Sequence, residues 1–284
     1  MNVLNEVTVA YPGREGAHSA VACDRLFPAS RLVPMPTFGD VAEAVATGRT
    51  TFGVLPIESS LVGPVNETHD LLWDSPLCIV AEAILPIRHC LVGIEAIALE
   101  AVTEIRSHAV ALDQCRRLLA SMPWATATVS GTTGDAAAAV AELRDPTVVA
   151  IASERAARIN RLTIVADNVG DHPEAYTRFA ALAPYTRLDR RDGVWRTAFS
   201  FVTDHRPGAL LRAISPLATR GIDLAQLVSR PIPKTPFKYR FDAVLAGHPL
   251  DDDVAAALRE MHAETAVLRV FGSYRADDEL GLQG

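Results

Sequence analysis

The alternation of short apolar runs with helical patterns is the feature that most constrains this fold. From Val7 to about Ala183, strand-like runs such as "VTVAY", "RLVPMPT" and "TFGVLPIESS" are each followed by a helix-forming stretch. The same order recurs after "VTEIRSH", "TATVS" and "TVVAIAS". Strands that alternate with helices in this way are typical of α/β folds with largely parallel sheets.

A long apolar run from Leu77 to Ile94 is interrupted by Pro86. It predicts two strands, or one crossing strand, that lead from one lobe to another, and the chain would return near residues 162–166. Two α/β lobes joined by two crossings leave a cleft between them, which is a common place for a small ligand. The expected boundaries are 5–83 with 165–184 for the first lobe, about 84–164 for the second, and 5–184 for the whole domain.

The pattern changes after the polar segment "YTRLDRRDG" at residues 185–193, which is typical of a linker. Over residues 195–275 the expected order is strand, helix, two strands, helix and strand, the βαββαβ order of ferredoxin-like domains. Pro216 falls inside the first of these helices, which indicates a kink or a position late in the helix.

The composition excludes several classes of function. The 284 residues carry a net charge of -7, so a nucleic-acid partner has no electrostatic support. The four cysteines form no CxxC pair and no zinc-type cluster, which favours a reduced, intracellular chain. No signal peptide or long apolar span is visible. We therefore expect a cytoplasmic protein with no cofactor, no metal and no membrane partner.

Four polar segments lie where strands are expected to end, the edge at which open α/β sheets bind ligands. "AYPGREGAHS" places Gly13 and Gly16 before a helix whose amides can hold an anion, although an ordinary turn is the simpler explanation. "LPIESSLVGPVNETHDLL" presents Glu58 and Ser59, with a capping cluster as the equal alternative.

The other two polar segments also begin helices. In "SHAVALDQC", Ser107 and Gln114 are seven residues apart, so they would share one helix face, although an N-cap and a surface Gln explain the segment more simply. "SGTTGDAAAAVAEL" places Thr132 and Thr133 at another helix start, where capping is again the alternative.

The stretch "EAYTRFAALAPY" places Thr177 and Arg178 immediately before a small and apolar run that begins at Phe179. Arginine is almost never fully buried unless it is paired, and its guanidinium can hold a carboxylate through two parallel hydrogen bonds. Thr177 adds a neutral donor. Together with the hydroxyl and amide groups of the other segments, this pair predicts a site for a small polycarboxylate.

Taken in order over nearly the whole chain, these motifs resemble those of the prephenate dehydratases that carry a C-terminal ACT domain. The family patterns are "YxGxxGxxS", "PIENSxxGxVxxTxDLL", "SHxxALxQC", "TRF", "PGAL" and "ESRP". This sequence has "YPGREGAHS", "PIESSLVGPVNETHDLL", "SHAVALDQC", "TRF", "PGAL" and "VSRP". The resemblance implies a two-lobed, periplasmic-binding-protein-like catalytic domain, an ACT domain, and conversion of prephenate to phenylpyruvate in L-phenylalanine biosynthesis.

By the same resemblance, Thr177 would donate a hydrogen bond to the departing ring hydroxyl, which is electrostatic catalysis. Arg178 would anchor a carboxylate or brace the site. Independently of the resemblance, Glu58 would be the proton source if it is buried. The remaining substrate-binding residues implied are Ser59, Ser107, Gln114, Thr132, Thr133 and Phe179.

Several positions depart from the family pattern. Ser59 and Ala175 stand where the family has Asn, and Gly170 stands where it has Gln. Neighbouring residues compensate, or the substrate or the outcome differs, as in enzymes that decarboxylate prephenate without making the ring aromatic. A non-catalytic, phenylalanine-binding regulator is the alternative from another class.

The resemblance also implies that phenylalanine binds between ACT domains of a homodimer or homotetramer. Val228 replaces the Glu of "ESRP", so feedback control is weakened or lost, or the domain serves dimerisation alone. The residues implied at this regulatory site are Pro207, Gly208, Ala209, Leu210, Ser229, Arg230 and Pro231.

Overall fold

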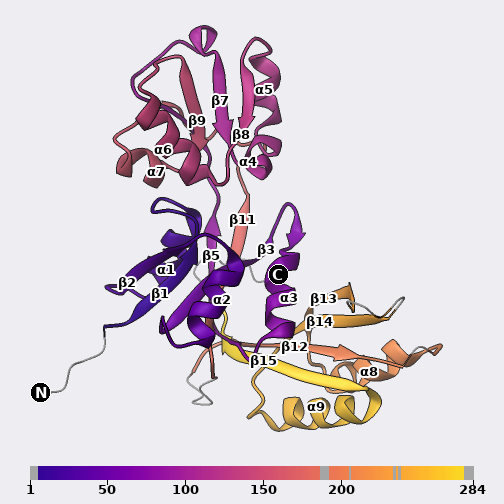
Figure 1. Cartoon of the computed structure of the whole chain (residues 1–284). Coiled ribbons are helices and arrows are strands. Elements are labelled where there is room, and N and C mark those ends of the chain that lie inside the picture. The colour runs from indigo at the N-terminus through magenta and orange to yellow at the C-terminus, as the bar shows by residue number, and fades with distance from the viewer. Residues whose placement is uncertain (1–5, 186–191, 205, 233–234, 236–237, 278–284) are drawn as a thin grey trace, which may run out of the picture.

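The structure is a computed structural model that describes residues 6–185, 192–204, 206–232, 235 and 238–277. Two α/β lobes lie one above the other, and a C-terminal domain packs beneath the first lobe (Figure 1). Each of the three units has its own sheet. The α/β class and the two-lobed architecture expected from the sequence are confirmed. Most of the predicted linker at 185–193 falls outside the described residues.

The first lobe has the strand order β2-β1-β3-β11-β5, and β4 pairs with β3. Neighbouring β1, β2 and β3 are parallel, and β11 runs antiparallel between β3 and β5. The bounds are β1 (Thr8–Pro12), α1 (His18–Leu26), β2 (Arg31–Met35), α2 (Phe38–Ala46), β3 (Phe52–Ser59), β4 (Gly63–Pro64), α3 (Asn66–Asp74), β5 (Cys78–Pro86) and β11 (Tyr176–Ala183).

The second lobe has the strand order β10-β6-β9-β7-β8. Its helices α6 and α7 cover an alanine-rich core that includes Ala136, Ala150 and Ala156. The bounds are β6 (Cys90–Gly93), η1 (Leu99–Ala101), β7 (Glu104–Ser107), α4 (Ala109–Asp113), α5 (Arg116–Ser121), β8 (Thr126–Val129), α6 (Thr133–Leu143), β9 (Val148–Ala152), α7 (Glu154–Ile159) and β10 (Thr163–Ala166).

The two crossings between the lobes differ slightly from those expected. The apolar run splits at Pro86 into β5 and β6, one of the two predicted outcomes. The return lies at residues 167–175, later than expected, because β10 still pairs with β6 in the second lobe. A further tie comes from the loop before α1, where the Ser153 hydroxyl donates to the Gly16 carbonyl at 2.8 Å.

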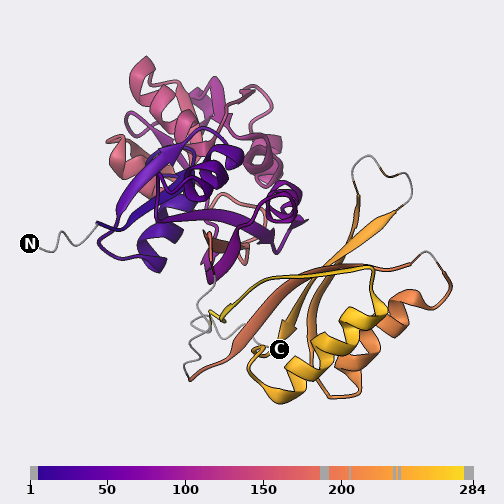
Figure 2. The same ribbon diagram turned by 60° about the horizontal axis from the view of Figure 1, so that its bottom comes forward.

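The C-terminal domain has the predicted βαββαβ order and an antiparallel sheet, β13-β14-β12-β15. Both helices cover the sheet face that points away from the lobes (Figure 2). Pro216 lies late in α8, as one of the two expectations had it. No described helix is long and apolar enough to cross a bilayer. The bounds are β12 (Trp195–Val202), α8 (Ala209–Ala218), β13 (Leu224–Pro231), β14 (Tyr239–Ala246), α9 (Asp252–Glu264) and β15 (Val267–Arg275).

The opposite face of this sheet lies directly against β5 of the first lobe. A Cβ atom built on Gly272 would lie 2.2 Å from the carbonyl oxygen of Ile79, and the φ angle of Gly272 is +150°. Only glycine permits so close an approach between two backbones. The first-lobe sheet is therefore covered by α1 on one face, and by α2, α3 and the C-terminal domain on the other.

Candidate active site

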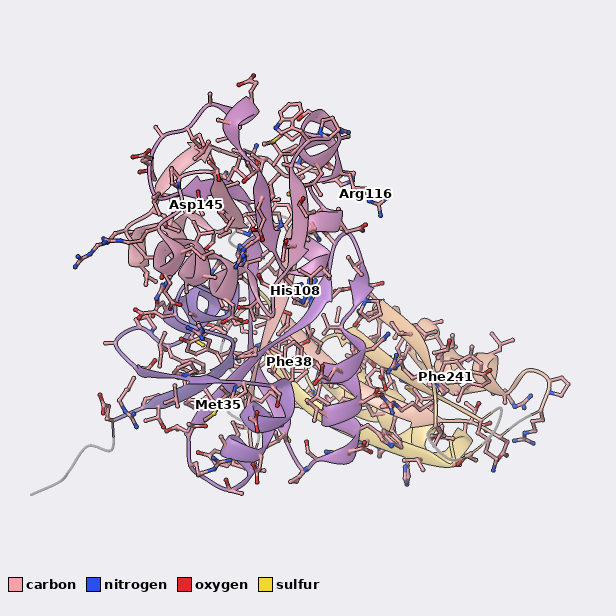
Figure 3. The ribbon with its side chains drawn as sticks, turned by 45° about the horizontal axis from the view of Figure 1, so that its top comes forward. Met35, Phe38, His108, Arg116, Asp145 and Phe241 are labelled. Carbon is pink, nitrogen blue, oxygen red and sulfur yellow. The ribbon has the colours of Figure 1, made fainter. Side chains whose placement is uncertain are left out.

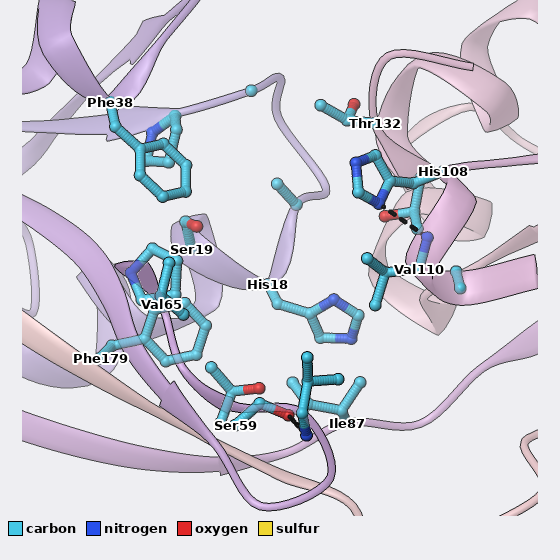
Figure 4. Close-up of a pocket in the computed structure, with 18 of the residues that line it drawn as sticks. His18, Ser19, Phe38, Ser59, Val65, Ile87, His108, Val110, Thr132 and Phe179 are labelled. Atoms are coloured by element: carbon cyan, nitrogen blue, oxygen red, sulfur yellow. Dashed lines mark hydrogen bonds between the residues drawn. The ribbon is translucent and has the colours of Figure 1, made fainter. Parts of the chain in front are cut away.

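A cleft of about 640 Å³ lies between the two lobes. Phe38 of the first lobe and His108 of the second lie on either side of the junction (Figure 3). Strand ends and the starts of α1, α3, α4 and α6 contribute the lining (Figure 4). Of the predicted catalytic and substrate-binding residues, the cleft brings together Thr177, Ser59, Gln114, Thr132, Thr133 and Phe179.

Thr177 and Phe179 reach the cleft from the same strand. They are two residues apart on β11, and side chains at such spacing point to the same face of a sheet. Thr177 pairs with Ser59 of β3, so the two hydroxyl-bearing residues lie side by side at the strand ends. Phe179 is 2% exposed and forms an apolar wall beside them.

The predicted capping alternative holds for Thr132, but not for the segment that contains Ser59, because the N-cap of α3 is Val65 and no side chain caps that helix. Thr132 caps α6: its Oγ1 accepts from the Asp135 N–H at 3.0 Å and donates to the Asp135 carboxylate at 2.8 Å. The Ser59 Oγ accepts from the N–H groups of Leu61 and Val62 at 3.3 and 3.4 Å. Lining the cleft and closing a turn are therefore compatible at both positions.

Ser107 does not line the cleft. It is fully buried, and its hydroxyl donates to the carbonyl oxygen of Ile151 at 2.7 Å. The predicted helix face shared with Gln114 is also wrong, because α4 contains only Ala109–Asp113 and Gln114 is its C-cap. Ser107 thus ties β7 to β9 behind the site, and His108 takes the N-cap position of α4.

Glu58 and Arg178 lie on the opposite face of the sheet from the cleft, which contradicts the predicted contact with substrate. Arg178 Nε is 3.2 Å from Glu58 Oε2, and its Nη1 is 2.8 Å from Glu82 Oε2. Gln226 of β13 donates to Glu58 Oε1 at 2.8 Å. The physical reason is the two-residue period of a strand: with Thr177 facing the cleft, Arg178 faces the C-terminal domain.

Three histidines also line the cleft, His18, His89 and His108, and the sequence motifs predicted a role for none of them. Burial lowers the pKa of His18 to about 4 and also lowers that of His89, so both rings are neutral near pH 7. The Nε2 atom of His89 lies 2.9 Å from Gln114 Oε1. His108 is the histidine of the "SHxxALxQC" pattern, whereas His18 falls on an undefined position of "YxGxxGxxS".

The cleft carries little formal charge. Among the described residues that line it, Glu67 is the one Asp, Glu, Lys or Arg. The starts of α1 and α6 supply backbone N–H groups and the positive ends of helix dipoles instead. In the described part of the chain, no group of three His, Cys, Asp or Glu residues is arranged to hold a metal ion.

Within one chain, the predicted regulatory residues fall into two groups. Pro207, Gly208, Ala209 and Leu210 line a surface pocket of about 410 Å³ at the start of α8. Ser229, Arg230 and Pro231 lie on β13 and do not line that pocket. Arg230 points toward the first lobe, where its Nη2 atom lies 2.7 Å from Asp70 Oδ2.

Comparisons with known proteins agree with this geometry. The family model for prephenate dehydratase matches residues 9–186. An arogenate dehydratase/prephenate dehydratase of Arabidopsis thaliana is 34% identical, with 96% of this chain and 74% of the relative covered.

Two solved structures are similar over nearly their whole length. A prephenate dehydratase in complex with L-Phe from Arthrobacter aurescens is 30% identical, with a TM-score of 0.86 and coverage of 96% of this chain and 91% of that chain. GqqA, described as a novel type of quorum quenching acylase, is 32% identical, with a TM-score of 0.87 and coverage of 95% and 98%. The chain belongs to the prephenate dehydratase family and is a dehydratase of the lyase class.

Proposed function

We propose that this member of the prephenate dehydratase family converts prephenate to phenylpyruvate in L-phenylalanine biosynthesis. The observation that carries the proposal is Thr177, a hydroxyl donor that faces the cleft beside the aromatic wall of Phe179. Phe38 lines the same cleft and also comes from the first lobe (Figure 4), so a six-membered carbon ring has apolar surfaces to contact.

The chemistry needs one well-placed donor. The ring carboxylate of prephenate leaves as carbon dioxide, and the electron pair of its carbon–carbon bond enters the ring. The C–O bond at the opposite ring carbon breaks, and the departing hydroxide takes a proton from solvent to become water. The ring becomes aromatic, which makes the reaction favourable. Thr177 keeps its own proton and stabilises the developing charge on oxygen through a hydrogen bond.

The remaining residues bind and orient the substrate. The carboxylates meet the N-termini of α1 and α6, where Thr133 adds a hydroxyl group and Thr132, whose proton is donated to Asp135, shapes the turn. Ser59 lies beside Thr177 and fills the position of the family Asn. Gln114, already in contact with His89, orients the substrate from the second lobe.

A second candidate substrate is arogenate, the 2-amino analogue of prephenate. Glu67 gives the lining its only formal charge among the described residues, and that charge is negative. Arogenate carries an ammonium group, and thus one net negative charge fewer than prephenate, so this cleft disfavours it less. The name of the Arabidopsis relative includes both activities.

For the C-terminal domain, we propose a phenylalanine site that two copies of the chain complete. The pocket at Pro207, Gly208, Ala209 and Leu210 would face β13 of a second copy, with Ser229 and Pro231 exposed there. A homodimer or homotetramer is required for this arrangement. Val228 supplies no carboxylate for the amino group of phenylalanine, so we expect weak binding. Calorimetric titration with L-phenylalanine measures the affinity. Absence of heat would exclude the site.

The test of function is incubation of the pure protein with prephenate and, separately, with arogenate. Ultraviolet absorbance and mass spectrometry would follow phenylpyruvate and phenylalanine against the rate without enzyme. Phenylpyruvate formation supports the first proposal, and a higher kcat/KM with arogenate supports the second. A non-aromatic product that has lost only carbon dioxide would contradict both, and would indicate that Ser59 and Ala175 redirect the reaction.

A further inference from the structure

The cleft poses a problem of charge balance for the substrate of the proposed function. Prephenate carries two carboxylates, yet no Lys or Arg is among the described residues that line the cleft. Backbone N–H groups at two helix starts supply partial charges only. The ionisable bases on the lining are His18, His89 and His108.

Of these three histidines, His18 is the one whose position allows it to provide a positive charge to the substrate. It is the first residue of α1, and its ring projects between Ile87 and Val110 (Figure 4). The backbone carbonyl of Arg88 lies beside the ring and favours its protonated form. A neutral imidazole has a single N–H, so the other ring nitrogen carries a lone pair, which repels a carboxylate oxygen.

The groups around His18 come from four elements. His89, on the connection between β5 and β6, meets the His18 ring edge-on, with 6.1 Å between ring centroids. Glu67 lies on α3, and His108 precedes α4. Arg14, in the loop before α1, forms an ion pair with Asp135 of α6, with 2.6 Å between Arg14 Nε and Asp135 Oδ1. None of these supplies an unpaired cation to the lining.

We propose that the dianionic substrate binds together with one proton, which the His18 ring takes up. The protonated ring has two N–H donors, one for the Arg88 carbonyl and one for a substrate carboxylate. The proton comes from solvent and remains on His18 until product leaves. The inference rests on the proposed function, because it requires a substrate with two carboxylates.

Only one of the two neighbouring rings, His18 or His89, can be protonated in the complex with substrate. In the free protein the pKa of His18 is about 4, lowered first by burial and then by His89, so protonation at pH 7 weakens binding by a factor of about 10³. A charge-assisted hydrogen bond in a water-poor cleft offsets that factor. Protonation of His89 as well would place two cations 6.1 Å apart and is excluded on that ground.

The test is calorimetric titration of prephenate into Thr177→Val, which retains the cleft and turns over slowly. Binding enthalpies at pH 7.5 in phosphate and in Tris, whose ionisation enthalpies differ, give the number of protons taken up. We expect about one proton, and a Kd that rises roughly tenfold for each unit of pH above 7.

Three further variants, in the same Thr177→Val background, make the result specific. His18→Phe, with a ring of similar size, is expected to take up no proton and to bind about 10- to 100-fold more weakly. His18→Gln retains a neutral N–H donor and should recover part of the affinity without proton uptake. His262→Gln, at an exposed position of α9, should behave like its parent.

Tight binding with no proton uptake would overturn the inference, as would uptake that persists in His18→Phe. In either case turnover of prephenate by the unmodified protein would leave the proposed function intact. If that protein neither binds nor converts prephenate, the proposed function and this inference fail together.

Discussion

The two faces of strands β3 and β11 differ sharply in chemistry although they share one backbone. The cleft face presents Ser59, Thr177 and Phe179, with no formal charge among these three side chains. The face toward the C-terminal domain presents Glu58 and Arg178, which join Gln226 and the buried Glu82 in a partly buried network. Alternate residues along β3 and β11 thus have different roles: one set lines the cleft, and the other contacts the C-terminal domain.

The separation of the two faces allows the cleft to carry few charged side chains, because the ionic contacts that hold the strands lie on the other face. The strands need strong anchoring to hold Thr177 in place, and the ionic contacts behind them provide it without entering the cleft. Glu82, whose side chain is only 1% exposed, also meets Arg196 of β12. The C-terminal domain is therefore bonded to the back of the strand that carries the reacting donor.

The largest expected effect belongs to the cleft face. Thr177→Val keeps the shape of the side chain and removes its hydroxyl, so kcat should fall by about 10²–10³ with little change in stability. Steady-state kinetics with prephenate and a thermal melt measure the two quantities. A kcat within threefold of the unmodified enzyme would show that Thr177 is not the catalytic donor.

The next effect belongs to the opposite face. Arg178→Met leaves Glu82 with one guanidinium partner fewer in a buried position, so unfolding free energy should fall by about 3 kcal/mol. Denaturant titration measures it. Arg49→Met is the matched control: its pair with Glu43 is exposed, so the change should stay within about 0.5 kcal/mol. Equal losses in the two variants would contradict the contrast between buried and exposed pairs.

Acid should lower the stability of the folded protein through His18, which lines the cleft. The pKa of His18 is 6.5 in the unfolded chain and about 4 in the folded one, so the unfolded state binds the proton more strongly. Stability is full above pH 6.5 and is lost as pH falls toward 4, by up to about 3 kcal/mol.

Unfolding free energies at pH 7.5 and 5.0 test this linkage. His18→Phe should lose less stability on acidification than the unmodified protein, because its cleft has one ring fewer to protonate on unfolding. His262→Gln is the control on the exposed side of α9. An identical acid response in the His18 variant would assign the effect elsewhere.

The smallest effect concerns docking of the C-terminal domain. Gln226→Met removes one hydrogen bond to Glu58, which retains Arg178 as a partner, so the loss should be about 1 kcal/mol. In a double-mutant cycle with Arg178→Met, the two losses should not add, because both residues contact Glu58. Strict additivity would show that the network does not act as a unit.

The sequence predicted the fold well because the strands and helices of each unit follow from patterns of neighbouring residues. Alternating strands and helices gave the α/β lobes, and the βαββαβ order gave the C-terminal domain. The motifs selected six residues that line the cleft. Ser107 was misassigned because it ends β7 with its side chain buried against β9, and a short polar motif does not show which way a side chain at a strand end points.

His18 was missed for a related reason. Its place on the lining depends on how the start of α1 meets the connection between β5 and β6, about 70 residues later. No periodicity or spacing within either segment records that contact. The lowered pKa of the ring, which makes it notable, arises from burial that both segments create together.

By itself, the sequence placed Thr177 and Arg178 next to each other at the start of a strand, and two-residue alternation sends such neighbours to opposite faces. It could not say which face would line the cleft, because period-two alternation is the same from either side. The tertiary structure decided this: the second lobe and its helix starts cover the Thr177 face, and the C-terminal sheet, with Gln226 and Arg196, covers the other. A hydroxyl suits a cleft that binds a ring, and a guanidinium needs the carboxylates that only the opposite side provides.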